Sequence, residues 1–170
     1  MEKSYLRKLC LSGIMIAIGY IVTAFLGIPY ASGAGYLNFG DVITLVSSVI
    51  LGPWYGAFIG VVFSSMADLT SGFVMFIPFT IVAKALMAIT AGLLYRVFPK
   101  KIKFLSFLIG TLLMVLIYFI SYMVYFGIGA YVSTLFDLIQ AVVATVLGYI
   151  VIAVLERVIP KLQKGLKIDE

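Results

Sequence analysis

The sequence contains no histidine and a single cysteine, Cys10. Without histidine there is no serine–histidine dyad for hydrolysis, and one cysteine forms neither an internal disulfide nor a soft-metal site. The sequence also lacks a glycine-rich loop ending in Lys-Thr or Lys-Ser, which holds nucleotide phosphates in many ATPases. We therefore expect no enzyme active site, no metal and no cofactor.

Charged residues are scarce as well. They make up 11% of the 170 residues, whereas 64% are hydrophobic and the mean hydropathy is +1.20. A chain of this composition is solvated mainly by lipid. Its net charge of +5 does not indicate a nucleic-acid partner, because the basic residues flank apolar segments and meet lipid head groups there. We expect one membrane-embedded domain over residues 1–170.

The basic residues are confined to short clusters. Eleven of the twelve lie at the start, middle and end of the chain, in the order Lys3, Arg7, Lys8; Arg96, Lys100, Lys101, Lys103; and Arg157, Lys161, Lys164, Lys167. Because basic flanks stay on the cytoplasmic side, this pattern predicts a multi-pass protein of the cell membrane with both termini and the central loop in the cytoplasm. An even number of crossings must then separate successive clusters.

The sequence between the clusters divides into six apolar runs, at Leu9–Ile28, Val42–Leu51, Trp54–Ala67, Phe73–Phe98, Phe104–Phe126 and Val132–Leu155. The first, fifth and sixth reach the roughly 20 residues that cross about 30 Å of hydrocarbon, whereas the second and third are shorter. The first also exceeds the core of a signal peptide, so we expect a retained helix. The sequence predicts an all-α, polytopic membrane protein with six transmembrane helices, two of them short.

The longest non-helical stretch runs from Gly27 to Gly40 and lies outside the cell in this topology. Its glycines give it conformational freedom, and Tyr36 and Phe39 give it apolar faces. It is either a plain connector or a lid over an outward-facing pocket. Asp41, which follows it, is expected to cap the second helix.

Lys84 is the one basic residue outside the clusters. It lies about six residues into the fourth helix, roughly 9 Å from the outer end, where a charge is costly and usually functional. Thr80 lies on the same helical face. Lys84 either contacts a ligand, or forms an ion pair with Asp68 or Asp137, or extends to the outer head groups.

Polar and aromatic residues of the last two helices face the same depth. Asp137 and Gln140 share one helical face, where they line a pocket or form a structural hydrogen bond between helices. Tyr118, Tyr122 and Tyr125 recur at helical spacing in the fifth helix. The outer two fit an aromatic belt, whereas the deeper Tyr118 can stack on a planar ligand.

A family resemblance is carried by the segment from Tyr36 to Tyr95, which contains YLNFGD, LVSSVILGPWYGAFIGVVFSSMADLTSG and PFTIVAKALMAITAGLLY. It closely resembles the substrate-binding S-components of energy-coupling-factor vitamin transporters. The resemblance implies a six-helix protein that captures a vitamin outside the cell and associates with a transmembrane coupling protein and two cytoplasmic ATPases. It also implies that Gly13 and Ala17, a small-residue pair on the first helix, contact the coupling protein.

The NFGD and TIVAK patterns look most like the group that handles pyridoxine and hydroxymethylpyrimidine. We expect a pocket for a small flat heteroaromatic ring, formed by Tyr36, Asn38, Thr80, Lys84, Tyr118, Tyr122, Asp137 and Gln140. The alternatives are an S-component for riboflavin or thiamine, and a stand-alone ion-coupled secondary transporter with Asp137 as proton carrier. A membrane assembly factor without a pocket is a third class.

Overall fold

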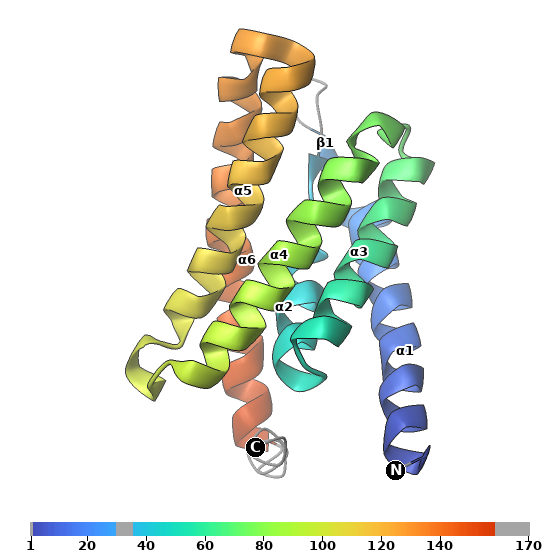
Figure 1. The fold of residues 1–170 in the computed structure, drawn as a ribbon, viewed down its shortest axis with the longest axis vertical. Helices are drawn as coiled ribbons and strands as arrows, with labels where there is room; N and C mark the ends of the chain where they lie inside the picture. Colours follow the sequence, from blue (N-terminus) through green and yellow to red (C-terminus); the bar gives the residue numbers. More distant parts are fainter. Residues whose placement is uncertain (1, 30–35, 159–170) are drawn as a thin grey trace.

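The computed structural model describes residues 2–29 and 36–158, and this part of the chain is almost entirely helical (Figure 1). Its elements are α1 (Glu2–Leu26), β1 (Ile28–Pro29), β2 (Tyr36–Leu37), α2 (Asp41–Ile50), α3 (Pro53–Thr70), η1 (Val74–Phe76), α4 (Ile77–Val97), η2 (Lys100–Ile102), α5 (Phe104–Phe126), η3 (Gly127–Gly129) and α6 (Ala130–Val158). The all-α prediction is confirmed, and each predicted apolar run falls mainly on one α-helix.

Within the described residues, three helical segments are long and apolar enough to cross a membrane: Tyr5–Leu26, Val74–Val97 and Lys100–Val158, the last of which contains both α5 and α6. The ten residues of α2 rise only about 15 Å, half of a hydrocarbon core. Seven of those residues are buried, and α2 packs against α1, α3, α4 and α6. Neighbouring helices therefore surround this short helix in place of lipid.

The core lies around α2. Leu45 and Val49 of α2 belong to one buried cluster with Met87 of α4, Phe107 of α5 and Ile152 of α6. A glycine permits the close approach of α3 to α2, because a Cβ atom at Gly56 would lie 2.5 Å from Ser48 Cα. These contacts fix the position of Asp41, the first residue of α2, inside the bundle.

A tight turn joins α2 to α3, as the Gly52-Pro53 pair predicts. Gly52 has a φ of +112°, which L side chains rarely adopt, and Pro53 begins α3. This turn, both ends of the described chain and the α4–α5 connection lie at one end of the molecule, whereas β1 and the α3–α4 and α5–α6 turns lie at the other (Figure 1).

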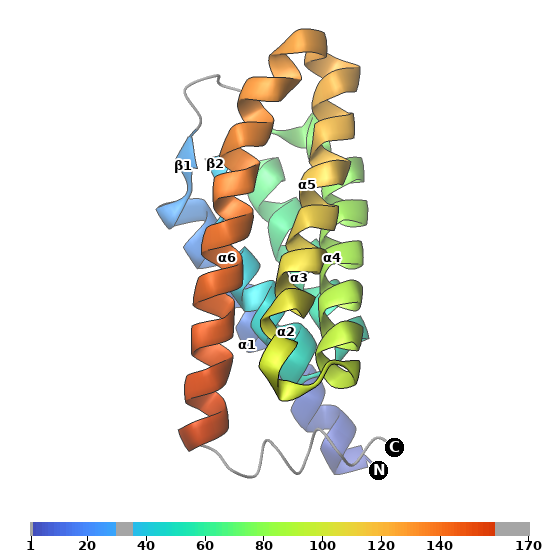
Figure 2. The same ribbon diagram turned by 90° about the vertical axis from the view of Figure 1, so that its left-hand side faces the viewer.

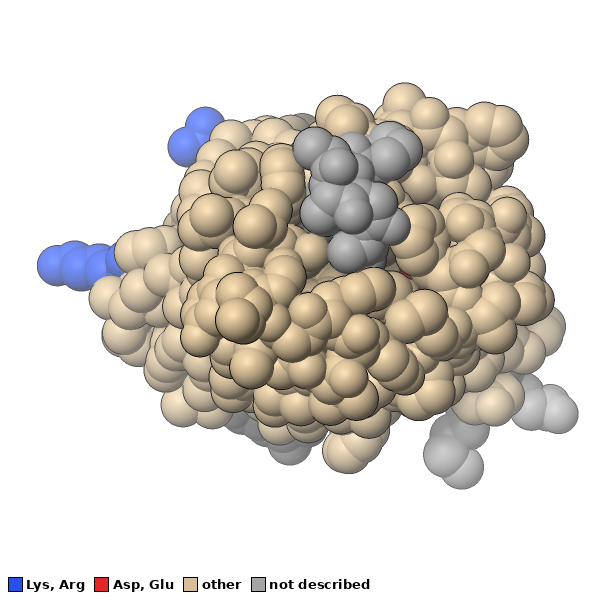
Figure 3. All heavy atoms as spheres, turned by 90° about the horizontal axis from the view of Figure 1, so that it is seen from above, with Lys and Arg blue, Asp and Glu red and all other residues tan. Residues whose placement is uncertain are grey.

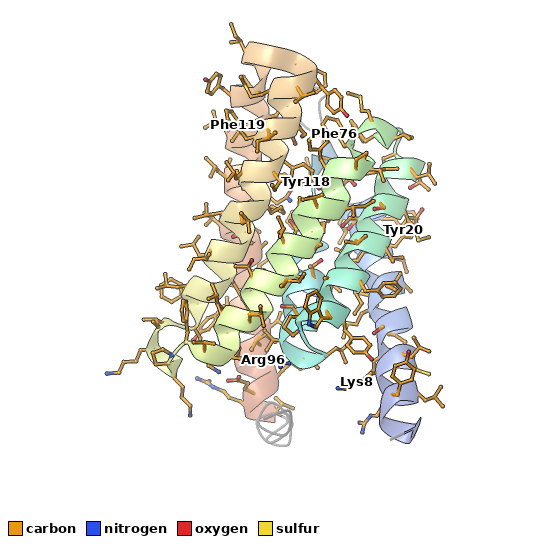
Figure 4. The ribbon with its side chains drawn as sticks, in the orientation of Figure 1. Lys8, Tyr20, Phe76, Arg96, Tyr118 and Phe119 are labelled. Atoms are coloured by element: carbon orange, nitrogen blue, oxygen red, sulfur yellow. The ribbon has the colours of Figure 1, made fainter. Side chains whose placement is uncertain are left out.

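The described basic side chains follow this division. Lys8 and Arg96 lie at the end that carries the chain termini (Figure 4). Seen from the opposite end, Lys and Arg appear only at the rim of the surface (Figure 3). Lys161, Lys164, Lys167 and the side chain of Lys3 lie outside the described residues. Apart from the buried Lys84, the described basic side chains thus lie at one end of the helices, as expected for basic residues that face one side of a membrane.

The predicted loop between Gly27 and Gly40 is non-helical where the structure describes it. In it, β1 pairs with β2 in antiparallel register, with Ile28 opposite Leu37 and Pro29 opposite Tyr36. The pair lies beside the upper part of α6 (Figure 2). It thereby holds the Tyr36 backbone next to the helix that carries Asp137 and Gln140.

Candidate ligand-binding site

A buried polar pocket lies between the helices, in the half of the molecule remote from the basic end. Phe76 and Tyr118, two of its lining residues, lie well above Lys8 and Arg96 (Figure 4). The enclosed part of the pocket has a volume of about 30 Å³, and the pocket opens at a mouth on one side. The pocket is lined by Tyr36, Asn38, Asp68, Phe73, Phe76, Thr80, Lys84, Tyr118, Tyr122, Asp137 and Gln140.

All eight residues that the sequence predicts for a pocket lie in this lining. Three further lining residues, Asp68, Phe73 and Phe76, are missing from that prediction. These three residues lie around the α3–α4 turn. In the sequence they fall at the outer ends of two helices, level with the Gly27–Gly40 loop, and this position could have identified them as lining residues. From the sequence we expected Asp68 only as an ion-pair partner of Lys84.

Lys84 is fully enclosed, with 1% of its side chain exposed, and its ammonium group forms an ion pair with the Asp41 carboxylate. Its Nζ also lies 3.3 Å from the sulfur of Met114 and 5.5 Å from the ring centroid of Tyr118. The buried charge of Lys84 on α4 is therefore neutralised by Asp41 of α2, and residues of α5 cover it.

The prediction that Lys84 forms an ion pair with Asp68 or Asp137 was wrong, because Lys84 pairs with Asp41. The prediction that Asp41 caps α2 was also wrong. Gly40 occupies the N-cap position, and the first amides of α2 bond to backbone carbonyls of the preceding turn, such as Thr44 N to Gly40 O at 3.1 Å. The Asp41 carboxylate is not needed there and is free to neutralise a buried ammonium group.

Gln140 connects this ion pair to the loop. Its Nε2 donates to Asp41 Oδ2 at 2.7 Å, and its Oε1 accepts from the Asn38 backbone amide at 2.7 Å. Asn38 Oδ1 accepts in turn from Thr23 Oγ1 of α1 at 2.7 Å and from Gly40 N at 2.8 Å. One hydrogen-bonded chain thus ties α1, the β2–α2 connection and α6 together at the pocket wall.

A second network ends on Asp68. Tyr36 Oη donates to Asp68 Oδ1 at 2.8 Å, and Thr80 Oγ1 donates to Asp68 Oδ2 at 2.6 Å. Tyr118 Oη donates to Thr80 Oγ1 at 3.1 Å. Burial, together with the adjacent Asp68 carboxylate, raises the pKa of the Tyr36 hydroxyl, which therefore stays protonated and donates.

Aromatic rings form the upper wall of the pocket. Tyr118 and Tyr122 stack with centroids 6.3 Å apart and an interplanar angle of 21°, and Phe76 meets Tyr122 edge-on at 5.6 Å. The Tyr122 hydroxyl is close enough to interact with the Asp137 carboxylate. Tyr125 instead bonds to the Met75 carbonyl near the surface. Of the outer two tyrosines, then, Tyr122 lines the pocket and Tyr125 does not.

Gly13 and Ala17 lie on α1, away from the pocket. Both are exposed, and a Cβ atom at Gly13 would meet no atom within 4 Å. Among the described helices, α1 packs on α3 and, less extensively, on α2. The face of α1 that carries Gly13 and Ala17 is therefore uncovered.

The sequence model of the family described as "ECF-type riboflavin transporter, S component" matches residues 3–157. A protein of Pyrococcus woesei, described as an uncharacterized protein in gap 3'region, is 33% identical over 134 residues, which are 75% of this chain and 87% of the relative. The thiamine precursor transporter HmpT of Lactococcus lactis subsp. cremoris is 28% identical over 159 residues, 92% of each chain. The chain therefore belongs to the ECF-type riboflavin transporter S-component family and is a membrane transporter subunit, not an enzyme.

Proposed function

We propose that this S component captures hydroxymethylpyrimidine or pyridoxine from outside the cell with high affinity. The observation that carries the proposal is the buried pocket, in which eleven polar and aromatic residues from separate parts of the chain converge. It lies in the half of the molecule opposite Lys8 and Arg96 (Figure 4). We propose that this end faces outward, that all six helices cross or enter the membrane, and that both termini are cytoplasmic.

The chemistry of the pocket favours a small flat ring. Stacked tyrosines offer aromatic faces, and the hydroxyl and carboxyl groups beside them offer oxygen atoms that can accept directed hydrogen bonds. Nanomolar binding needs about 12 kcal/mol, which a dozen heavy atoms supply at under about 1.5 kcal/mol each.

HmpT, similar along 92% of the chain, is described as a thiamine precursor transporter. That description supports a pyrimidine ligand over riboflavin, the ligand in the family's printed description. Pyridoxine stays in the proposal because its ring is of similar size and also carries hydroxymethyl groups. Thiamine is the remaining alternative, since it contains the same pyrimidine with a second ring attached.

Closure of the pocket is part of the proposal. The hydrogen bond from Tyr36 to Asp68 and the packing of the Tyr36 ring on Phe73, with centroids 5.6 Å apart, bring the loop against the α3–α4 turn. We propose that the part of the predicted lid around Tyr36 covers the bound ligand and excludes water, because an open mouth would weaken each buried hydrogen bond. Residues 30–35 of the predicted lid lie outside the described residues.

Uptake requires an energy source that the chain lacks, since it has no nucleotide-binding motif. S components of this family associate with a membrane coupling protein and ATPases. We propose that the coupling protein docks on the uncovered face of α1, where Gly13 and Ala17 permit close approach of another helix.

The deciding experiment is calorimetry on the purified chain with hydroxymethylpyrimidine, pyridoxine, thiamine and riboflavin in turn. We expect nanomolar binding of one of the first two and weaker binding of the others. Nanomolar binding of riboflavin or thiamine alone would replace the proposed ligand, and no heat with any of the four would reject the ligand class. Uptake by the chain alone in liposomes, abolished by an uncoupler, would favour the secondary transporter instead.

A further inference from the structure

The ammonium and amide donors of Lys84 and Gln140 in the pocket already interact with an acceptor of the protein. The ammonium group of Lys84 faces Asp41 Oδ1, and Gln140 Nε2 donates to Asp41 Oδ2. Both Asp41 oxygens thus have protein donors, and the positive charge of Lys84 is cancelled by its neighbour. Lys84 is therefore not available as a receptor for an anionic ligand.

The hydroxyl groups of the pocket are oriented toward an acid. Protons of Tyr36 and Thr80 point at the two oxygens of Asp68, and the proton of Tyr118 points at Thr80. The Asp68 carboxyl group accepts a hydrogen bond on each oxygen, and these two bonds stabilise its ionised form against the desolvation of the site. What these three hydroxyl groups still offer a ligand is lone pairs rather than protons.

The lining contains two further carboxyl groups. With Asp41 and Lys84 cancelled, Asp68 and Asp137 are the other ionisable acids of the lining. Asp68 also lies in the last turn of α3, which ends at Thr70, where the helix dipole adds negative potential. In a buried site this potential opposes a second anion much more strongly than it would in water.

We propose that Asp68 is a specificity-determining residue, which makes the pocket accept ligands that donate hydrogen bonds or carry positive charge and reject anionic forms of the same ring. This inference rests on the proposed function and narrows its ligand class: the amine, hydroxymethyl or protonated-ring form binds, and a phosphate ester or carboxylate of that ring does not.

The test measures ligand affinity by calorimetry on the full chain. The ligands are hydroxymethylpyrimidine, pyridoxine, thiamine and riboflavin, and each is compared with its own phosphate ester. A matched pair of pyrimidines, with a carboxamide or a carboxylate in place of the hydroxymethyl group, separates charge from size. For every ring that binds, we expect the anionic partner to bind at least a hundredfold more weakly. For the size-matched pair, we expect the carboxamide to bind at least tenfold more tightly than the carboxylate.

Two substitutions assign the effect to Asp68. Asp68→Asn removes the charge at nearly constant shape, and the preference for the uncharged form should fall at least tenfold. Tyr36→Phe removes a donor but keeps the charge, so the preference should persist. Glu156→Gln is the control, because Glu156 pairs with Tyr95 at the other end of the helices and should not alter it. If Asp68→Asn does not fold, the ligand pairs and Tyr36→Phe still decide.

The outcomes separate the two proposals. An anionic form that binds as tightly as its uncharged partner overturns the role of Asp68 and leaves the proposed function intact. If Tyr36→Phe abolishes the preference for uncharged ligands, or if Asp68→Asn leaves that preference unchanged, another group selects against anions. Either result also overturns the role proposed for Asp68. Failure of all the unmodified rings to bind overturns the proposed function, and the inference with it.

Discussion

Lys84 of α4 and Asp41 of α2, 43 residues apart in the sequence, form an ion pair whose side chains are 1% and 0% exposed. A buried ion pair contributes little net stability, because desolvation offsets the attraction, but removing one partner leaves an uncompensated charge. Gln140 bonds to the same carboxylate. The pair therefore fixes the relative positions of α2, α4 and α6 at the floor of the pocket.

We predict that Lys84→Ala destabilises the protein by about 3–5 kcal/mol, because the Asp41 carboxylate is left buried without its counter-charge. Lys84→Arg should not restore the wild-type stability, since the planar guanidinium group is bulkier than the ammonium group that this site encloses. The measurement is thermal or denaturant unfolding of each variant in detergent, with no ligand present.

The control for this prediction is the double variant Lys84→Met with Asp41→Asn, which removes both charges. It should recover much of the stability lost in Lys84→Ala, because neither charge is then buried alone. A double variant as unstable as the single one would show that packing, rather than charge, accounts for the loss.

The proposed topology predicts which loops are reached from outside. In a Cys10→Ser background, a cysteine at Ser71, in the α3–α4 turn, should react with an impermeant maleimide in intact cells. A cysteine at Lys101, in the α4–α5 connection, should react only after the membrane is permeabilised. Both positions are exposed in the structure, so burial does not explain a difference between them. Labelling of Lys101 in intact cells would reverse the proposed orientation.

The helices were predictable from the sequence because the length and spacing of apolar runs report directly on how the chain meets lipid. The Gly52-Pro53 turn was also predictable, since glycine readily adopts the positive φ found there and proline is favoured at the first position of a helix. The β1–β2 pair was not, because each strand has two residues and its register comes from packing against α6.

The pocket residues were predictable because a polar side chain within an apolar run has few other uses. The hydrogen-bond and ion-pair partners of these residues could not be predicted from the sequence. Whether Lys84 pairs with Asp41, Asp68 or Asp137 depends on how α2 enters the bundle, and each carboxylate lies near the outer end of its helix in the sequence. The direction of the Tyr36 and Thr80 hydroxyl groups toward Asp68 likewise follows from tertiary packing and not from spacing.

For the coupling protein, we predict that Gly13→Leu or Ala17→Leu abolishes ATP-dependent uptake and co-purification with the partner, because a large side chain prevents close approach of two helices. Ligand binding by the isolated chain should remain, since neither residue lines the pocket. Val124→Leu, on the exposed face of α5, is the control. Normal uptake by both α1 variants would place the docking surface elsewhere.

The last prediction concerns the link between the loop and α6. Gln140→Leu keeps the size of the side chain but leaves the Asn38 amide and Asp41 Oδ2 without their partner, at about 1–3 kcal/mol for each buried group. Ligand affinity should fall at least tenfold, because Asn38 and the loop lose their anchor on α6. Calorimetry on the purified variant measures this loss.

The matched control for Gln140→Leu is Thr111→Val, which breaks the buried hydrogen bond between Thr111 and Thr145 at 3.0 Å, outside the pocket. Both variants lose stability, but only Gln140→Leu should lose affinity, because Thr111→Val leaves the pocket wall intact. Equal loss of affinity in the two would mean that binding follows overall stability. Unchanged affinity in Gln140→Leu would mean that the loop is held over the ligand by the Tyr36–Asp68 bond alone, and Tyr36→Phe should then weaken binding in its place.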